Sequence, residues 1–277
     1  PESQTLRSLV DDRGVRNYHV KPKGRLDRAV MSEINKLIES EEFHIIHCHD
    51  YKSLFYVFKI AKQLKLPIVH HIHGSLGNSY QERIYGFIEN LMIRKVAKIF
   101  TVSLEQKHNL ENSFYLYPQI KQVPNGTPVQ PMNKRDVDRC RKLKLIMVAR
   151  FTEEKNHLLA LNLIVESKKK NIPVSLTLLG DGPLKKEIED YINTHSLQQD
   201  INLVGFTRDV QSWLEQSDVL LITSNTEGMP MNMLEGMASG LPVISTAVGE
   251  IPRLIKESNC GETFSDLEEL VDIIIKI

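Results

Sequence analysis

The stretch TEGMPMNMLEGMASGLPVIST, residues 226–246, contains two glutamates, Glu227 and Glu235, that lie eight residues apart. Pro230 stands between them and marks a helix start, because the N–H group that proline lacks has no partner at the first position of a helix. A small-residue turn and the β-type run LPVIST come next. A helix that only packs against a sheet does not need a carboxylate on each side of its N-terminus. The stretch therefore predicts a strand-to-helix loop that carries function.

Strand-like and helix-like segments alternate outward from this stretch, which predicts an α/β fold with mostly parallel strands. In the second half of the chain the strand-like runs cover residues 143–149, 174–180, 201–205, 218–224 and 241–246. The helix-like runs between them cover residues 157–167, 183–192, 210–217 and a segment after Pro230. In the first half the strand-like runs cover residues 15–20, 43–49, 67–73 and 97–103, and the helix-like runs cover residues 26–40, 52–65 and 82–95.

A polar, basic stretch without apolar periodicity, residues 133–141, separates the two alternating series and is the best linker candidate. The sequence therefore predicts two doubly wound, Rossmann-like domains, residues 1–130 and 140–277, that face each other across a cleft. In open parallel sheets of this kind, ligands bind at the carboxyl ends of the strands. The loops that follow the strand-like runs are thus the places to look for functional residues.

Composition narrows the class of partner and the cellular setting. The 277 residues include 35 Lys plus Arg and 35 Asp plus Glu, and this zero formal balance argues against nucleic acid as the main partner. The three cysteines are scattered and odd in number, so a reducing compartment fits better than a disulfide framework. No apolar run reaches the roughly 18 residues of a membrane span. We therefore expect a cytoplasmic protein.

Two cations follow the strand-like run at residues 143–149. Arg150 stands at its end, and Lys155 comes five residues later, near a predicted helix start. A helix N-terminus supplies unpaired N–H groups and partial positive charge, and each charge-assisted hydrogen bond contributes about 1.5–3 kcal/mol. Together these groups suit a diphosphate. Two solvated surface cations are the alternative explanation of the same residues.

Two further loops contain residues suited to a ligand. Gly180 and Gly182 flank Asp181 and permit close approach of a ligand to the backbone, although a plain strand-to-helix turn has the same pattern. Glu235 lies in a segment too small and apolar for a solvent face, and a buried carboxylate needs a partner or a ligand. We expect Glu235 to accept hydrogen bonds from two vicinal ribose hydroxyls. Glu227, close to the helix N-terminus, is expected to accept hydrogen bonds from other ligand hydroxyls.

The histidines of the first half suggest a metal site without matching a known one. His47 and His49 share one face of a strand, and His71 and His73 repeat that spacing. The familiar binuclear hydrolase pattern is His-x-His-x-Asp-His, whereas here Asp50 comes one position early and no histidine follows it. We therefore predict no metal and expect these histidines to act as hydrogen-bonding or acid–base groups. A metallohydrolase stays a remote alternative.

At this point the sequence resembles a known family. Arg150, Lys155 and the runs LLGDGP, LVGF and EGMPMNMLEGMASGLPVI occur in an order similar to the second domain of the retaining GT-B-fold glycosyltransferases of family four, group 1. The two glutamates separated by seven residues, followed by G-x-P-V, are specific for that superfamily. IIHCHD, VHHIHG and VPNG extend the resemblance into the first domain, so that it covers nearly the whole chain.

The resemblance implies a nucleotide-sugar donor bound mainly by the second domain and an acceptor bound mainly by the first. It implies that Arg150 and Lys155 hold the donor diphosphate, Glu235 the ribose and Glu227 the transferred sugar, and that His73 lies near the reacting centre. It also implies retention of configuration, with no cofactor and no metal, because the two cations neutralise the diphosphate. The remaining residues expected on the donor side are Gly180, Asp181, Gly182, Gly228, Met229, Pro230 and Met231.

Three departures from the family pattern stand out. Glu250 replaces the second glycine of a Gly-Gly pair and Arg253 replaces a glutamate, which changes how backbone N–H groups there can approach a ligand. Asn156 follows Lys155 where glycine is common. The family's first strand with its glycine-rich loop, and its closing C-terminal helices, have no recognisable counterpart, so we expect an incomplete N-terminal domain.

The leading hypothesis is a glycosyltransferase that builds a surface polysaccharide, a lipopolysaccharide or a similar glycan on a glycan or lipid-linked acceptor. One alternative is a truncated protein that binds a nucleotide sugar without turnover. Another is a different GT-B activity, such as a nucleotide-sugar epimerase. Lipid-linked acceptors would bring peripheral contact with the inner face of the membrane, although a buried helix explains the apolar run LFYVFKIAKQLKL better.

Overall fold

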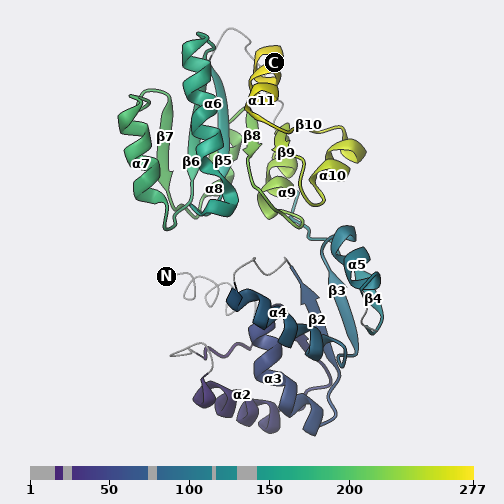
Figure 1. The fold of residues 1–277 in the computed structure, drawn as a ribbon. Helices are drawn as coiled ribbons and strands as arrows, with labels where there is room; N and C mark the ends of the chain where they lie inside the picture. Colours follow the sequence, from purple (N-terminus) through teal and green to yellow (C-terminus); the bar gives the residue numbers. More distant parts are fainter. Residues whose placement is uncertain (1–15, 21–26, 74–79, 114–116, 130–141) are drawn as a thin grey trace. The chain divides into compact units, whose positions relative to one another are not determined.

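The computed structural model describes residues 16–20, 27–73, 80–113, 117–129 and 142–277, without the side chains of residues 80–85. The chain divides into two compact units (Figure 1), and each is described by itself. The first unit takes most of the described residues up to Ile120. The second takes those of Lys121–Ile277 together with Thr101–Ser113 and His73. The predicted linker, residues 133–141, lies outside the described residues. None of the described helices is both long and apolar enough to pass through a bilayer.

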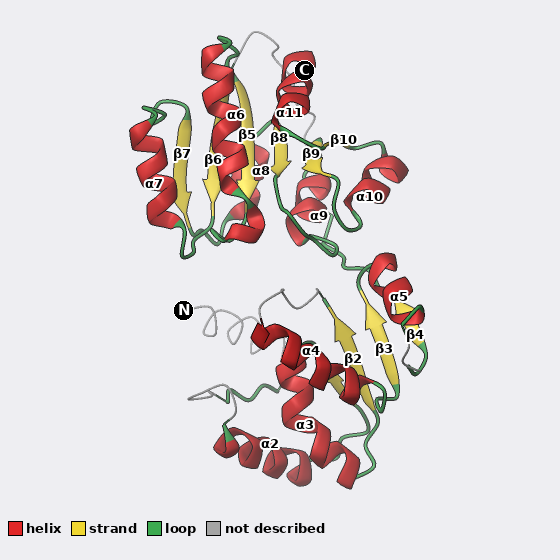
Figure 2. Cartoon of the chain, in the orientation of Figure 1, coloured by secondary structure: helices red, strands yellow, loops and turns green. Residues whose placement is uncertain are grey.

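The first unit contains most of a four-stranded sheet with the order β1-β2-β3-β4, of which Figure 2 labels β2, β3 and β4. Its strands are β1 (Ile46–Cys48), β2 (Ile68–Ile72), β3 (Lys98–Thr101) and β4 (Ile120–Gln122), and its helices are α2 (Arg28–Ser40), α3 (Tyr51–Gln63) and α4 (Tyr80–Ile93). β1 and β2 run parallel. Side chains define two of the helix starts: Asp27 accepts a hydrogen bond from the N–H of Ala29, and Asp50 forms a capping box with Ser53.

The second unit contains a six-stranded sheet with the order β10-β9-β8-β5-β6-β7, in which all neighbours are parallel. Its strands are β5 (Leu143–Val148), β6 (Val174–Leu179), β7 (Ile201–Gly205), β8 (Val219–Ile222), β9 (Val243–Thr246) and β10 (Gly261–Phe264). Its helices are α5 (Leu104–Glu111), the 3₁₀ turn η1 (Glu153–Lys155), α6 (His157–Lys169), α7 (Lys185–Thr194), α8 (Val210–Glu215), α9 (Met231–Ala238), α10 (Ile251–Ser258) and α11 (Leu267–Lys276).

Successive side chains of the central strands point to opposite faces of the sheet, so the second unit has one hydrophobic core on each face. In β5, Leu145 and Met147 pack on one face with α6, α7 and α11, while Ile146 packs on the other with α8, α9 and α10. Residues 145–147 of β5 and the whole of β8 are therefore buried on both faces, as expected for a parallel sheet covered by helices. This arrangement confirms the predicted α/β class with doubly wound strands.

The strand order of the second sheet reverses at one point, between β5 and β8. The chain moves from β5 to β6 and β7 on one side, then crosses over to β8, β9 and β10 on the other, so β5 and β8 are neighbours. Ligands of doubly wound sheets bind at the carboxyl ends of the strands where the order reverses. The loops that follow β5 and β8 are therefore the expected ligand site, and they contain Arg150, Lys155 and Glu227, whereas Glu235 lies in α9.

Several sequence expectations need correction. Residues 16–20, predicted as a strand, have no regular structure; Arg16 and Tyr18 instead donate hydrogen bonds to the carboxylate of Glu41. α7 begins at Lys185, two residues after Pro183. The sequence did not indicate the short elements α5, β4, α10 and β10, because their apolar patterns are too brief.

Candidate functional site

The loops after β5 and β8 are tied together by hydrogen bonds between backbone and side chains. Thr223, at the end of β8, donates its hydroxyl to the carbonyl oxygens of Lys155 and Asn156, each at 3.0 Å. The N–H of Asn225 donates to the carbonyl of Glu154 at 2.8 Å. On α9, the amide of Asn232 donates to the carbonyl of Val148 at 2.8 Å. The two loops therefore form one rigid rim at the point where the strand order reverses.

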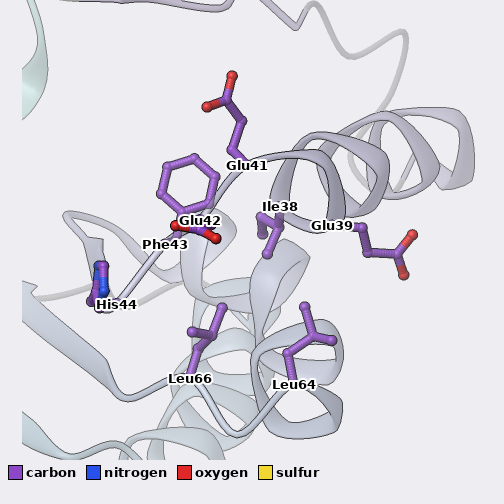
Figure 3. A pocket seen from close by; sticks show the side chains of 8 residues that line it. All are labelled: Ile38, Glu39, Glu41, Glu42, Phe43, His44, Leu64 and Leu66. Atoms are coloured by element: carbon purple, nitrogen blue, oxygen red, sulfur yellow. The ribbon is translucent and has the colours of Figure 1, made fainter.

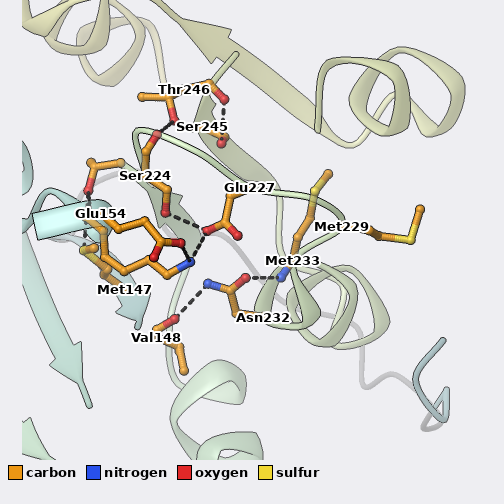
Figure 4. A network of polar contacts seen from close by, with 12 residues as sticks. Met147, Val148, Glu154, Ser224, Glu227, Met229, Asn232, Met233, Ser245 and Thr246 are labelled. Atoms are coloured by element: carbon orange, nitrogen blue, oxygen red, sulfur yellow. Dashed lines mark hydrogen bonds and ion pairs between the residues drawn. The ribbon is translucent and has the colours of Figure 1, made fainter. Parts of the chain in front are cut away.

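Lys155 and Glu227 meet on this rim, and Figure 4 labels Glu227 together with its neighbours Ser224 and Glu154. The ammonium nitrogen lies 2.6 Å from Oε1 of Glu227, and the hydroxyl of Ser224 donates to the same oxygen at 2.7 Å. The side chains are only 14% and 9% exposed, so this is a nearly buried ion pair. Glu154 adds a second, longer contact to the ammonium at 3.4 Å. A buried ammonium with carboxylate partners is held in a fixed position, which is what a group that must meet an anion requires.

The backbone around Lys155 explains how the lysine reaches Glu227. Lys155 ends the 3₁₀ turn η1, and Asn156 then adopts a left-handed backbone with φ of 48° before α6 begins. Asparagine tolerates this conformation and glycine adopts it freely, so Asn156 serves where the family resemblance led us to expect glycine. The departure at this position therefore leaves the turn intact.

Arg150 follows β5 and is exposed. It makes no ion pair with any residue that the structure describes, whereas Lys155 is paired and nearly buried. The structure thus brings Lys155 together with Glu227 and leaves the guanidinium of Arg150 facing solvent. An exposed guanidinium at the end of a central strand can turn toward an anion and bind it through two hydrogen bonds.

The helix α9 begins one residue later than predicted. Pro230 is its N-cap, with an extended backbone, and Met231 is the first helical residue. Met229 is buried and its carbonyl accepts a hydrogen bond from the amide of Asn125 at 2.9 Å, while Met231 is 42% exposed. Because Pro230 has no side-chain oxygen, the first N–H groups of α9 have no side-chain cap at this position.

Glu235 lies one turn into α9 and is partly buried. Burial raises the pKa of its carboxyl group. Within the described ranges the carboxylate has no hydrogen-bond donor, and only its backbone carbonyl is used, by Ser239. A partly desolvated carboxylate without a donor is suited to hydroxyl groups supplied by a ligand.

The glycines of the strand-end loops pack against neighbouring backbone. A Cβ at Gly180 would lie 1.9 Å from the carbonyl oxygen of Ala149, and one at Gly182 would lie 2.5 Å from that of Phe151. The carboxylate of Asp181 accepts a hydrogen bond from the N–H of Gly182 at 2.8 Å. Packing within the chain therefore accounts for these glycines by itself, and a role in ligand binding stays a prediction.

A second contact region joins the loops after β8 and β9. A Cβ at Gly249, whose φ is 56°, would lie 2.2 Å from the carbonyl oxygen of Glu227, and the N–H of Glu250 donates to the carbonyl of Gly228 at 3.0 Å. The carbonyl oxygen of His73 lies against Gly228 on another side, 3.1 Å from where a Cβ would stand. The side chain of His73 is exposed. The segment 227–228 is thus fixed by backbone contacts from two directions.

Glu250, flagged as a departure from the family, has a structural role. Its buried carboxylate accepts hydrogen bonds from the N–H of Leu104, at the start of α5, and from Nε of Arg253 at 2.6 Å. The charges of Glu250 and Arg253, the two departures from the family pattern, therefore neutralise each other. Glu250 also caps α5, whose first residue, Leu104, lies 146 positions earlier in the sequence. Sequence reasoning missed this contact, as it missed Ser224 and Asn125.

Arg150, Lys155, Glu227 and Glu235 stay the candidate residues for a ligand that bears both an anion and hydroxyl groups. Lys155 and Arg150 carry positive charge, and Glu227 and Glu235 carry oxygens that can accept hydrogen bonds from hydroxyls. Preorganised positive charge is most effective where negative charge develops during a reaction, because it needs no reorganisation at that moment. That these residues bind a phosphorylated sugar and stabilise a phosphate leaving group stays a prediction.

Comparison with known proteins identifies the family of the chain. The family described as glycosyl transferases group 1 matches residues 133–277, just over half of the chain, and the family described as Glycosyltransferase Family 4 matches residues 2–130. The chain is 26% identical over 304 aligned residues to the UDP-Gal:alpha-D-GlcNAc-diphosphoundecaprenol alpha-1,3-galactosyltransferase of Escherichia coli, covering 100% of this chain and 78% of that protein. It is 30% identical over 145 residues to the amylovoran biosynthesis glycosyltransferase AmsK of Erwinia amylovora, covering 49% of this chain and 36% of that protein.

Among solved structures, the chain resembles Alr3699/HepE of Anabaena in complex with UDP-glucose. The TM-score is 0.82 at 16% identity, and the match covers 98% of this chain and 79% of that one. At this identity the similarity shows the fold, which is the GT-B fold predicted from the sequence.

Proposed function

The chain belongs to the group 1 glycosyltransferases of family 4, and from that membership we propose that it transfers a hexose from a uridine diphosphate sugar to a glycan or lipid-linked acceptor with retention of configuration. The E. coli relative is named for a UDP-galactose donor and a diphosphoundecaprenol acceptor, and the Anabaena structure contains UDP-glucose. The Erwinia relative is named for amylovoran biosynthesis. These names support a role in the assembly of a polysaccharide, with a lipid-linked molecule as one possible class of acceptor.

The observation that carries the proposal is the buried pair of Lys155 and Glu227 at the point where the strand order reverses. An incoming diphosphate competes with Glu227 for the ammonium of Lys155, and Arg150 turns in from solvent to bind the same anion. Glu227 then accepts hydrogen bonds from hydroxyls of the sugar, with Ser224 still holding its carboxylate in place. Glu235 binds the ribose hydroxyls.

Transfer breaks the bond between the anomeric carbon and the oxygen of the β-phosphate and forms a bond from that carbon to an acceptor hydroxyl oxygen. The nucleoside diphosphate leaves with the bonding electron pair, and the proton of the acceptor hydroxyl passes to its departing oxygen. Lys155 and Arg150 stabilise the charge that develops on the diphosphate, a contribution that typically changes the rate by about 10²–10³ per donor group. His73 is proposed to contact the transferred sugar.

Thermal-shift and calorimetric titration with UDP, GDP, ADP and dTDP, each free and as its glucose, galactose and N-acetylglucosamine derivatives, tests the donor. We expect UDP and one of its sugars to raise the melting temperature, since a ligand at 100 times its Kd adds about 2.7 kcal/mol of stability. The preferred donor is then incubated with N-acetylglucosaminyl diphospholipid, and the anomeric configuration of the product is read by NMR. Failure of every nucleotide to bind would refute the proposal.

Binding without transfer to any lipid-linked or glycan acceptor would favour the alternative of a nucleotide-sugar-binding protein without turnover. Release of an epimerised sugar would favour a nucleotide-sugar epimerase. Arg150→Ala serves as a site-directed control for the donor assays, because the exposed side chain of Arg150 contributes nothing to the core.

A further inference from the structure

Three histidines gather at the carboxyl ends of β1 and β2 in the first unit. His47 lies in β1, His49 follows it by two residues, and His71 lies in β2. The register pairs Ile46 with Ile68, so the same offset places His49 opposite His71. Residues two apart in a strand share a face, which brings His47 onto the same face as His49. Parallel pairing of two strands, rather than a local motif, therefore assembles the cluster.

The geometry of the cluster is close to that of a metal site. One ring nitrogen from each of the three histidines lies within 4.8 Å of the others. The ring centroids of His47 and His49 are 4.3 Å apart, and that of His71 is 5.8 and 5.5 Å from them. A tetrahedral zinc ion with Zn–N bonds of roughly 2.0–2.1 Å needs nitrogens about 3.3 Å apart. His47 and His49 are exposed, so modest side-chain rotation closes this gap.

The surroundings of the cluster favour a site made of these three rings. Asp50, the nearest carboxylate in sequence, caps α3 by accepting the N–H of Ser53 at 2.6 Å. The neighbouring His70 is engaged elsewhere, with Nε2 at 2.9 Å from Glu89. Phe100 from β3 packs edge-on against both His47 and His71 and forms an apolar wall behind them. Three imidazoles with one open side are the ligand set of a three-histidine zinc site.

We propose that His47, His49 and His71 bind one divalent transition-metal ion of the zinc class, with the fourth coordination position open to water or another ligand. Imidazole ligands suit zinc, copper, nickel and iron, and zinc is the ion that needs no particular d-electron geometry. The sequence alone did not predict a metal here, because the motif lacked the expected spacing of Asp50 and a following histidine. The proposal does not depend on the proposed function, since Lys155, Glu227 and Glu235 belong to the other unit.

Isothermal titration of the full chain with zinc chloride tests the proposal. The protein is freed of any histidine tag and of metal by EDTA and dialysis. We expect one zinc per chain, with affinity at least tenfold weaker in His47→Ala and in His49→Ala, because even groups that only orient a ligand contribute roughly 10–100-fold. Both histidines are exposed, so neither substitution threatens the core. Circular dichroism confirms that each variant is folded.

His44→Ala is the matched control. His44 is exposed in the same unit, three residues before His47, and lines a hollow of 490 Å³ beside Phe43 and Leu66 (Figure 3). This variant is expected to bind zinc like the wild type. Absence of saturable zinc binding by the wild type would overturn the proposal, and so would equal affinity in the His47→Ala and His49→Ala variants or an equal loss in His44→Ala.

UDP titration of the same variants separates the two proposals. If zinc binding fails while UDP binds normally, only the metal site is refuted. If UDP fails to bind while zinc binding depends on His47 and His49, only the proposed function is refuted. Co²⁺ substitution gives an independent readout, since visible absorption of a tetrahedral cobalt site should disappear in the double variant His47→Ala/His49→Ala.

Discussion

Replacing both members of the buried pair, one at a time and together, measures how strongly Lys155 and Glu227 are coupled. Lys155→Met keeps most of the side-chain volume and leaves the carboxylate of Glu227, 9% exposed, with Ser224 as its remaining donor. Breaking a buried pair costs about 3–5 kcal/mol. Because both side chains retain some exposure, we expect the lower value, about 3 kcal/mol, for Lys155→Met.

Glu227→Gln is expected to cost less, about 2 kcal/mol, because Glu154 remains 3.4 Å from the ammonium and partly compensates its charge. In the double variant neither charge is left unpaired, so its cost should be near 2 kcal/mol rather than the additive value of about 5 kcal/mol. The coupling energy is then about 3 kcal/mol, at the upper end of the range found for residues in direct contact.

Urea unfolding followed by tryptophan fluorescence provides the assay. The chain has one tryptophan, Trp213, which lies in α8 and packs against the core of the second unit. Its signal therefore reports the unfolding of the unit that contains the pair. Equal m-values across the four proteins would show that the same surface is exposed in each transition.

A second cycle on α6 supplies the control. Lys169 and Glu166 form an ion pair at nearly the same distance, 2.7 Å, but their side chains are 66% and 34% exposed. Exposed pairs of this kind are worth about 0.3–0.5 kcal/mol. A coupling between Lys155 and Glu227 no larger than that between Lys169 and Glu166 would refute the inference that burial makes the first pair strong.

Three further predictions concern single residues of the second unit. Glu235→Ala should weaken UDP binding roughly tenfold or more through loss of charge-assisted hydrogen bonds. Burial raises the pKa of Glu235, so the affinity of the wild type for UDP should fall as the pH drops through that raised pKa. Calorimetry should find that UDP binding by the Glu235→Ala variant lacks this pH dependence. Glu250→Ala should lower the free energy of unfolding by about 1.5–3 kcal/mol because the N–H of Leu104 loses its carboxylate, and Glu257→Ala, which removes an exposed partner of Arg253, should lower it far less. Burial and then Lys155 lower the pKa of His157 to about 4, against about 6.5 when unfolded, so stability should fall as the pH drops from 6.5 toward 4, by up to about 3 kcal/mol. Thermal melts of His157→Leu should have lost most of that pH dependence, and an unchanged profile would contradict the assignment.

Short-range sequence information was enough for most of the fold. The apolar runs of β5 and β8, the helical periodicity of α6 and the turn residues between them depend only on neighbours a few positions away. The same holds for the positions of Lys155 and Glu227 in the connections that follow β5 and β8, because the carboxyl ends of strands are where functional loops occur. The prediction of a strand was wrong for residues 16–20. Their composition is strand-like, but among the described residues they have no neighbouring strand to pair with.

Only the tertiary structure decided which of these groups meet. Lys155 pairs with a glutamate 72 residues away because β8 lies beside β5, and Glu250 caps a helix 146 residues before it. His49 faces His71 because β1 and β2 pair in one register and no other. Local propensity cannot encode these contacts. They depend on the order and register of strands, which the chain fixes only by burying both faces of each sheet at once.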